Sequence, residues 1–144
     1  MNRNTGVAAA AGTLALATSF AVAFAEESKE VVHVDSATAN YAPINPDASR
    51  ATLWGNPESG PHAAFTRIAA GANVPLHTHT SDLRIAVLKG AYVYKPEKGA
   101  EIRVTAGQYL FIPGGLRHGT GTDAKEGVVF YQEADGKFDL IVVK

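Results

Sequence analysis

The sequence contains no cysteine, so its 144 residues can form no disulfide, thiolate metal site, iron–sulfur cluster or cysteine nucleophile. It also lacks a charge excess, because 13 basic and 14 acidic side chains leave a formal net charge of −1 at pH 7. Such a chain has no field to attract nucleic acid, and we expect no nucleic-acid partner. Its length and 46% hydrophobic content predict one globular domain. Any bound metal must be held by nitrogen or oxygen.

A long apolar run occurs only at the N-terminus, where it is typical of an export signal. Arg3 precedes the run, residues 7–25 carry no charge, and Ala23-Phe24-Ala25 forms an A-x-A cleavage site. We therefore predict a secretory signal peptide over residues 1–25, a single mature domain over residues 26–144, and a periplasmic or secreted location. The alternative is an uncleaved anchor, but the run is mostly Ala, Gly and Thr, which are weakly hydrophobic for a span. We expect no stable membrane anchor after cleavage.

No segment after the apolar run keeps a helical period, and short β-branched or aromatic runs take its place. The segments that we expect to form strands are 31–34, 63–68, 84–89, 91–95, 101–104, 108–112, 128–132 and 138–143. Gly, Pro, Asn and Asp lie between them, which is typical of an all-β sandwich or barrel. Asp135-Gly136 predicts a hairpin between residues 128–133 and 138–143. Residues 41–56 are expected to be an irregular arm laid across the barrel.

Three histidines have a spacing that suits a metal site. His77 and His79 would point to the same face of a strand, because side chains alternate with a period of two. His118 follows a Pro-Gly-Gly turn that could bring a second strand opposite the pair. Three neutral imidazoles suit a divalent transition metal with one to three open positions. The alternative is two exposed histidines in a polar loop and a third in a turn. His33 and His62 have no partner at metal-ligand spacing.

Glycines and a proline frame these histidines in a pattern that resembles the cupin superfamily. The two motifs read Gly71-x5-His77-x-His79-x3-Leu83-x6-Gly90 and Gly107-x5-Pro113-x-Gly115-x2-His118. The resemblance covers residues 63–132, and the layout of the whole chain is similar to small single-domain bacterial cupins of the ChrR-like group. It implies an all-β fold, a cupin-type antiparallel β-barrel also called a double-stranded β-helix or jelly roll. It also implies the three histidines as metal ligands, and a homodimer.

Leu83 occupies the position at which cupins usually carry a glutamate ligand. Leu83, Ile85 and Val87 form one apolar face, so the register is consistent. Asp82, one residue earlier, should point away from the metal unless a bulge re-aims it, and a turn role is its alternative. The expected ligand set is therefore three histidines without a carboxylate, which is similar to the three-histidine cupins that include ferrous thiol and diketone dioxygenases. Three neutral ligands leave a divalent ion its full charge, which favours anionic or chelating ligands.

The leading hypothesis is an exported cupin with one divalent transition metal ion that acts on a small molecule in the barrel. We expect iron(II) or zinc, with manganese, copper and nickel as competitors. An oxygen-dependent, dioxygenase-like reaction on iron(II) is the expected activity if the protein is an enzyme. The first alternative is a non-catalytic cupin that binds or senses a metal or small ligand. The second is a metal-free interaction module, which the presence of all three histidines disfavours.

Six further residues are candidates for contact with the substrate or a metal-bound ligand: Asp82, Arg84, Tyr109, Arg117, Tyr131 and Gln132. Either arginine could clamp a substrate carboxylate, although a surface ion pair is the alternative. The tyrosines and the glutamine lie on expected barrel strands, where a polar tip could bond a ligand or simply reach the rim. Residues 54–57 and Phe138-Asp139 are expected to be packing elements, and a lid over the barrel is the alternative.

Overall fold

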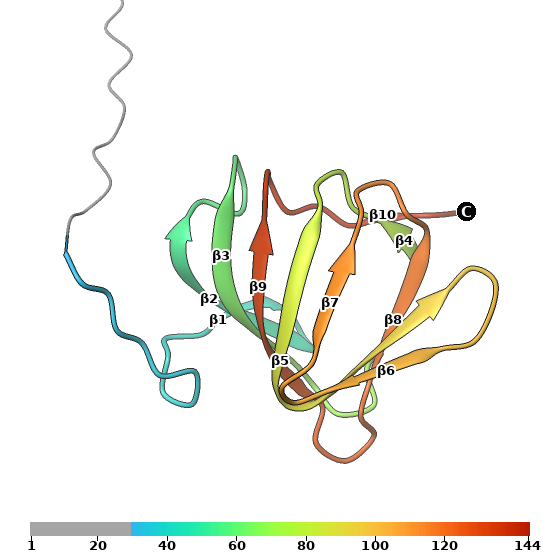
Figure 1. Ribbon diagram of the computed structural model, residues 1–144, viewed down its shortest axis with the longest axis horizontal. Coiled ribbons are helices and arrows are strands. Elements are labelled where there is room, and N and C mark those ends of the chain that lie inside the picture. Colours follow the sequence, from blue (N-terminus) through green and yellow to red (C-terminus); the bar gives the residue numbers. More distant parts are fainter. Residues whose placement is uncertain (1–29) are drawn as a thin grey trace, which may run out of the picture. The chain divides into compact units, whose positions relative to one another are not determined.

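A computed structural model describes residues 30–144, and these residues form an all-β fold (Figure 1). The strands are β1 Ala42–Asn45, β2 Ala48–Gly55, β3 His62–Ile68, β4 Asn73–Thr78, β5 Leu83–Pro96, β6 Ile102–Thr105, β7 Tyr109–Ile112, β8 His118–Thr122, β9 Val128–Ala134 and β10 Ile141–Val142. Within this part of the chain, no helix has the length and apolar character needed to cross a membrane. The export signal expected over residues 1–25 lies outside the described residues.

Strand β5 connects the two halves of the curled sheet. Its first half pairs antiparallel with β9 and β7, and its second half pairs antiparallel with β8 and β6. The register shifts between Val87 and Lys89, and Gly90 follows with a φ of 70°. A Cβ atom on Gly90 would lie 2.1 Å from the carbonyl oxygen of Gly127, so this bend requires glycine. The bend lets one strand serve both halves of the barrel.

The order of hydrogen-bonded neighbours is β1-β2-β3-β9-β5-β8-β4-β10, with β6 and β7 added along β5. The sheet curls into a half-barrel around its core (Figure 1). Leu83, Ile85 and Val87 are 3%, 1% and 1% exposed, which confirms the apolar face predicted for this strand. Aromatic side chains complete the core, with the rings of Tyr92 and Phe130 packed edge to face at 5.6 Å. The expectation of a cupin-type antiparallel barrel is confirmed.

Two expectations about the N-terminal part of the domain were wrong. Residues 31–34 form no strand, since a β-branched run needs a neighbour to complete its hydrogen bonds and no described strand pairs with it. Residues 41–56 are not an irregular arm, because they form the β1–β2 hairpin. Strand β2 then pairs with β3 along its whole length, and this long-range pairing gives a Pro-containing segment regular structure.

Two expectations about connectivity were also wrong. Residues 84–89 and 91–95 belong to one strand, β5, because Gly90 bends the chain without ending it. Residues 128–133 and 138–143 form no hairpin with each other. Strand β9 instead pairs with β3 and β5, while the two-residue β10 pairs with β4. Asp135-Gly136 therefore redirects the chain toward β4, where it reaches the histidines.

Candidate metal centre

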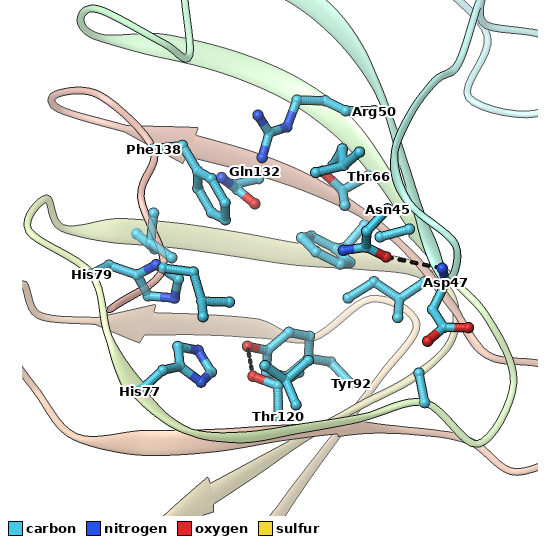
Figure 2. A pocket seen from close by; sticks show the side chains of 18 of the residues that line it. Asn45, Asp47, Arg50, Thr66, His77, His79, Tyr92, Thr120, Gln132 and Phe138 are labelled. Atoms are coloured by element: carbon cyan, nitrogen blue, oxygen red, sulfur yellow. Dashed lines mark hydrogen bonds between the residues drawn. The ribbon is translucent and has the colours of Figure 1, made fainter. Parts of the chain in front are cut away.

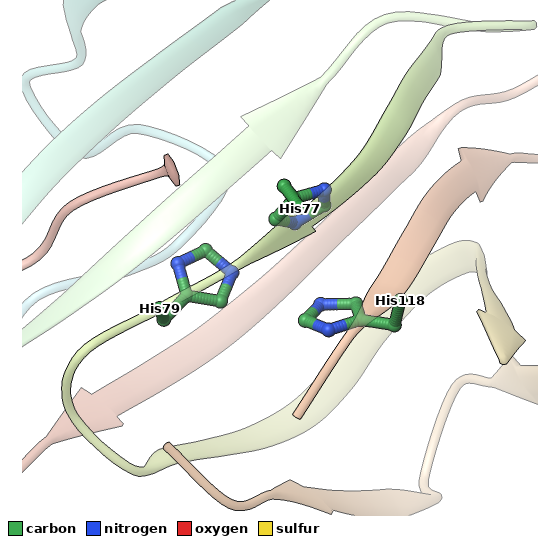
Figure 3. Close-up of side chains that lie close together, drawn as sticks. All are labelled: His77, His79 and His118. Carbon is green, nitrogen blue, oxygen red and sulfur yellow. The ribbon is translucent and has the colours of Figure 1, made fainter. Parts of the chain in front are cut away.

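Two strand ends bring the three histidines together. His77 lies in β4 and His118 begins β8, and the two are directly opposite each other in the antiparallel pair. His79 follows immediately after β4. The three side chains are 1%, 0% and 6% exposed for His77, His118 and His79. Figure 3 shows the rings turned toward one another from these elements. The opposing strand predicted after the Pro-Gly-Gly turn is confirmed.

Proline and glycine shape this local geometry. Pro75 cannot donate to a ladder, and the β4–β8 register shifts between Val74 and His77 around it. Gly114 lies against the backbone of Thr80, where a Cβ atom would be 2.5 Å from the carbonyl oxygen. The backbone N–H of Gly115 donates to the carbonyl oxygen of His79 over 2.7 Å. The second cupin motif therefore packs directly on the first and fixes the segment that carries His79.

Each of the three imidazoles donates a hydrogen bond from Nδ1 to a backbone carbonyl. His77 donates to Pro75 over 2.7 Å, His118 donates to Leu116 over 2.9 Å, and His79 donates to Asp139. These bonds fix the tautomer with the proton on Nδ1, which leaves the Nε2 lone pair available. The ligand-capable nitrogens all lie within 4.8 Å of one another.

The donor set fits a metal ion. Nε2 of His118 is fully buried and has no hydrogen-bond partner within residues 30–144, which is uncommon for a buried polar atom. Burial lowers the pKa of His77 and His118, and burial together with the neighbouring histidines lowers the pKa of His79 to about 4. The rings are therefore neutral at pH 7, which is the form that coordinates metal. Three neutral nitrogens facing one point suit a divalent transition ion.

Phe138 and Asp139 support His79 more directly than their expected packing role. The carboxylate of Asp139 accepts hydrogen bonds from the Thr80 backbone N–H over 2.8 Å and from its hydroxyl over 2.6 Å. Its backbone carbonyl accepts the Nδ1–H bond of His79, and the Phe138 ring lies 5.2 Å from that imidazole. Sequence spacing missed this contact, because about sixty residues separate the partners and no periodic pattern connects them.

A cavity of about 290 Å³ adjoins the histidines. His77 and His79 line one part of it, and Arg50, Thr66 and Gln132 line another (Figure 2). The Tyr92 hydroxyl lies 2.8 Å from the Thr120 hydroxyl on the cavity wall, and burial raises the pKa of Tyr92 to about 12. The cavity therefore has the histidines on one side and the polar side chains of Arg50, Thr66 and Gln132 on another, and most of the remaining lining is apolar.

The sequence matches the model of the ChrR cupin-like domain over residues 29–136. The chain belongs to this cupin family. A comparison with curated protein sequences gave no match.

Solved structures agree with the cupin fold. The polyketide cyclase RemF from Streptomyces resistomycificus is similar with a TM-score of 0.64 and 20% identity, over 80% of this chain and 87% of that chain. KdgF from Halomonas sp. is similar with a TM-score of 0.55 and 21% identity, over 67% of this chain and 87% of that chain. The DMSP lyase DddQ from Ruegeria pomeroyi is similar with a TM-score of 0.60 and 18% identity, over 74% of this chain and 62% of that chain. At these identities the likeness concerns the fold alone.

Of the six further candidates, only Gln132 lines the cavity of this cupin. The carboxylate of Asp82 accepts a hydrogen bond from Gly114 N over 2.8 Å and lies 3.9 Å from the Arg84 guanidinium, so it braces the turn. Arg117 pairs with Glu97 at 3.1 Å on the surface. Neither arginine is part of the cavity wall, and Asp82 is not part of the histidine cluster.

The two tyrosines point away from the cavity. Tyr109 is 62% exposed. Tyr131 alternates with the inward-facing Gln132 along β9 and packs its ring 6.3 Å from Phe65 on the other face of the sheet. His33 is exposed, while the buried His62 bonds through Nδ1 to the carbonyls of Gly60 and Gly136, away from the cluster.

Arg50 also lines the cavity, and no motif or spacing in the sequence points to it. It lies within the segment expected to be an irregular arm, and an isolated arginine on a strand carries no motif. Only the pairing of β2 with β3 places it at the site, because Arg50 is the register partner of the cavity-lining Thr66.

Proposed function

We propose that this cupin binds one divalent transition metal ion through Nε2 of His77, His79 and His118, and acts on a small molecule in the adjoining cavity. The observation that carries the proposal is the set of three buried imidazoles whose Nδ1 atoms are already bonded to backbone carbonyls. A ligand set of three nitrogens suits iron(II) or zinc, and manganese, copper and nickel are its competitors.

The side chains around the cavity provide an apolar lining and a hydrogen-bond donor for a ligand that is polarised by the metal. A bound divalent ion would supply Lewis acidity and open positions for a chelating molecule. Leu83 and Ile85 line the cavity and exclude water from the space beside the histidines. Tyr92 stays protonated at physiological pH, so its hydroxyl, positioned by Thr120, can donate a hydrogen bond to a ligand.

We propose an oxygen-dependent, dioxygenase-like reaction with O₂ as the oxidant and iron(II) as the metal. Asp47 is the only carboxylate among the described residues that line the cavity, and it is exposed at the edge. A hydrolase would need a general base near its nucleophilic water. Oxygen chemistry takes its electrons from the substrate and the metal, so it agrees better with this lining.

The second candidate function is non-catalytic binding or sensing of a metal or small ligand. The same scarcity of carboxylates in the described cavity wall favours it. The two candidates separate in an oxygen electrode. An iron-loaded enzyme should consume O₂ with a β-diketone or thiol substrate, whereas a binder should show a ligand-dependent rise in Tm without turnover.

The metal proposal is tested by elemental analysis of purified protein reloaded with iron(II) or zinc. We expect close to one equivalent in the wild type. His118→Gln removes one of three ligands, so its affinity should fall by at least about a hundredfold, the upper range for losing an outer hydrogen bond of a ligand. His33→Gln, at an exposed histidine, is the matched control and should bind like the wild type. A wild-type protein that cannot be loaded would contradict the proposal.

We also propose that residues 1–25 direct export and that the mature chain begins at Glu26, as the A-x-A pattern favours. Intact-mass analysis of the periplasmic fraction tests this, since the mature protein should lack the first 25 residues. Replacing Ala23 and Ala25 with bulky residues should block cleavage. Full-length protein confined to the cytoplasm would contradict export.

A homodimer remains our proposal for the assembly. The exposed aromatic side chains Tyr109 and Phe111 on β7, 62% and 43% exposed, support it because they offer an apolar surface to a second copy. Sedimentation equilibrium should give twice the chain mass, and a monomer at all concentrations would overturn the proposal.

A further inference from the structure

A second polar cluster faces the cavity away from the histidines. Arg50 on β2 is the register partner of Thr66 on β3, and Thr66 is in turn the partner of Phe130 on β9. Gln132 lies two residues beyond Phe130 and therefore on the same face of the sheet. Figure 2 shows Arg50, Gln132 and Thr66 near one another on one wall, with His77 and His79 across the cavity.

All three side chains contain buried polar atoms without a hydrogen-bond partner in the described part of the chain. These atoms are Nε of Arg50, Oγ1 of Thr66 and Nε2 of Gln132. Thr66 and Gln132 are only 4% and 2% exposed. Buried polar groups are nearly always satisfied, because an unsatisfied one carries the full cost of its desolvation. Three such groups on one wall indicate that a ligand completes them.

Arg50 adds a positive charge to this wall. Its guanidinium lies 4.3 Å from the centre of the Phe138 ring, and none of the ion pairs formed within residues 30–144 includes it. Burial lowers the pKa of Arg50, but a guanidinium remains protonated in proteins. Arg50 is half-buried, and a partly desolvated cation without a counter-ion favours the binding of an anion beside it.

The chemistry of the three groups specifies the ligand. Guanidinium and amide nitrogens only donate hydrogen bonds, and a threonine hydroxyl can donate, so the complementary group accepts and carries negative charge. One guanidinium balances one negative charge, which matches a carboxylate better than a phosphate dianion. Ile68, Ile85, Phe130 and Phe138 line the space between, and they suit an apolar body. The volume of about 290 Å³ limits the ligand to a small molecule.

We propose that Arg50, Thr66 and Gln132 form a carboxylate-binding subsite, and that the small molecule of this cupin is a compact monocarboxylate with an apolar body. Its carboxylate contacts Arg50 and its other end faces the histidines. The assignment of this molecule to the metal centre rests on the proposed function, whereas the subsite itself requires no metal.

The test measures binding of benzoate and butyrate to the full mature protein after chelator treatment, by calorimetry. The neutral amides benzamide and butyramide are matched probes of nearly equal shape. We expect at least one carboxylate to bind, and its amide to bind about tenfold or more weakly, because charged hydrogen bonds exceed neutral ones. If neither carboxylate binds at millimolar concentration, or if the amides bind equally well, the proposal is overturned.

Two variants locate the binding. Arg50→Met and Gln132→Leu should each weaken binding of the carboxylate by about tenfold or more, which is about 1.4 kcal/mol or more. Arg103→Met removes a surface arginine on β6, outside the cavity, and should bind the carboxylate like the wild type. Removing a half-buried charge that forms no ion pair should leave the Tm of the ligand-free protein unchanged or higher, so Arg50→Met is expected to fold. If it does not fold, Gln132→Leu decides: unchanged carboxylate binding in that variant overturns the subsite.

Zinc binding, measured separately on the same proteins, distinguishes the two proposals. Arg50→Met should bind zinc like the wild type, because Arg50 is not part of the histidine cluster. Carboxylate binding in a protein that binds neither zinc nor iron(II) would refute the metal centre and leave the subsite standing. Zinc binding without carboxylate binding would refute the subsite alone.

Discussion

At the scale of single residues, the protonation state of the three imidazoles affects both metal binding and the stability of the fold. Each ring is held neutral by burial, and each Nδ1–H has a backbone acceptor. Replacing the usual glutamate with Leu83, which is 3% exposed, removes the carboxylate that could have offset the charge of a protonated ring. Protons and metal therefore compete directly for the same nitrogens.

The metal-free protein should lose stability as the pH falls from about 7 toward 4. The folded pKa of His79 is lowered to about 4, and those of His77 and His118 are also lowered, whereas an unfolded histidine titrates near 6.5. The unfolded chain thus binds more protons in this window, and the free energy of unfolding decreases with falling pH. Urea unfolding of chelator-treated protein at several pH values measures the slope. The slope should shrink in His79→Gln and persist in His33→Gln, and an equal slope in both variants would contradict the assignment.

Asp139 should matter for metal affinity although it is not a ligand. Its carboxylate holds Thr80, and this contact keeps its own carbonyl against Nδ1 of His79. Asp139→Ala should weaken metal binding by about tenfold, in the range found for outer hydrogen bonds of metal ligands. A competition titration with a chelator measures it. Lys137→Ala removes an exposed side chain 3.9 Å from the same carboxylate and should change little, and equal losses in both variants would contradict this role.

At the scale of elements, β5 decides the architecture because one strand is shared by both halves of the sheet. Its bend places Leu83 and Ile85 beside the cavity and Tyr92 on the cavity wall. The bend needs the positive φ of Gly90 and its close approach to Gly127. A side chain at position 90 would separate β5 from the turn before β9.

Gly90→Ala should therefore be strongly destabilising. The positive φ costs an alanine about 1–2 kcal/mol, and the clash at 2.1 Å adds an overpacking cost of about 1–3 kcal/mol. Gly107→Ala is the matched control, since Gly107 has a φ of 85° with open space around its Cβ position. Urea unfolding should show the smaller loss, about 1–2 kcal/mol, in the control. Equal losses in the two variants would show that the close contact is unimportant.

At the scale of the whole molecule, stability comes from sheet packing without any covalent link. The chain has no cysteine, so a reductant should leave the Tm unchanged. A metal held by the histidines of β4 and β8 and by His79 would add a link between two strands that otherwise interact only through their antiparallel pairing and side-chain contacts. Binding to the folded state alone stabilises it by mass action.

Metal loading should raise the Tm by about 10 °C. A free metal concentration of 100 times the Kd adds about 2.7 kcal/mol, and about 1 kcal/mol shifts the Tm of a domain of this size by roughly 4 °C. Differential scanning calorimetry with and without zinc measures the shift. His118→Gln should show little of it, and a shift of the same size in that variant would place the ion elsewhere.

Local sequence patterns predicted the features that depend on neighbouring residues. Alternation along residues 83–87 predicted the inward face of β5, and the turn before His118 predicted the opposing strand. Predictions failed where strand pairing between distant segments determines the structure. The β1–β2 hairpin, which also pairs with β3, was expected to be an irregular arm, and β10 was expected to pair with residues 128–133 but pairs with β4. Candidate residues chosen because they neighbour a motif, such as Arg84 and Arg117, lie on the outside because adjacent strand residues face opposite ways.

The sequence by itself determined the cupin family and the three histidines, because motif spacing and glycine positions are local properties of the chain. Only the tertiary structure decided what surrounds them. Arg50 reaches the cavity through the pairing of β2 with β3, and Asp139 reaches His79 because the chain after β9 crosses to β4. Such contacts join residues far apart in sequence, and they depend on the packing of the curled sheet as a whole. No periodicity or spacing in the chain records them.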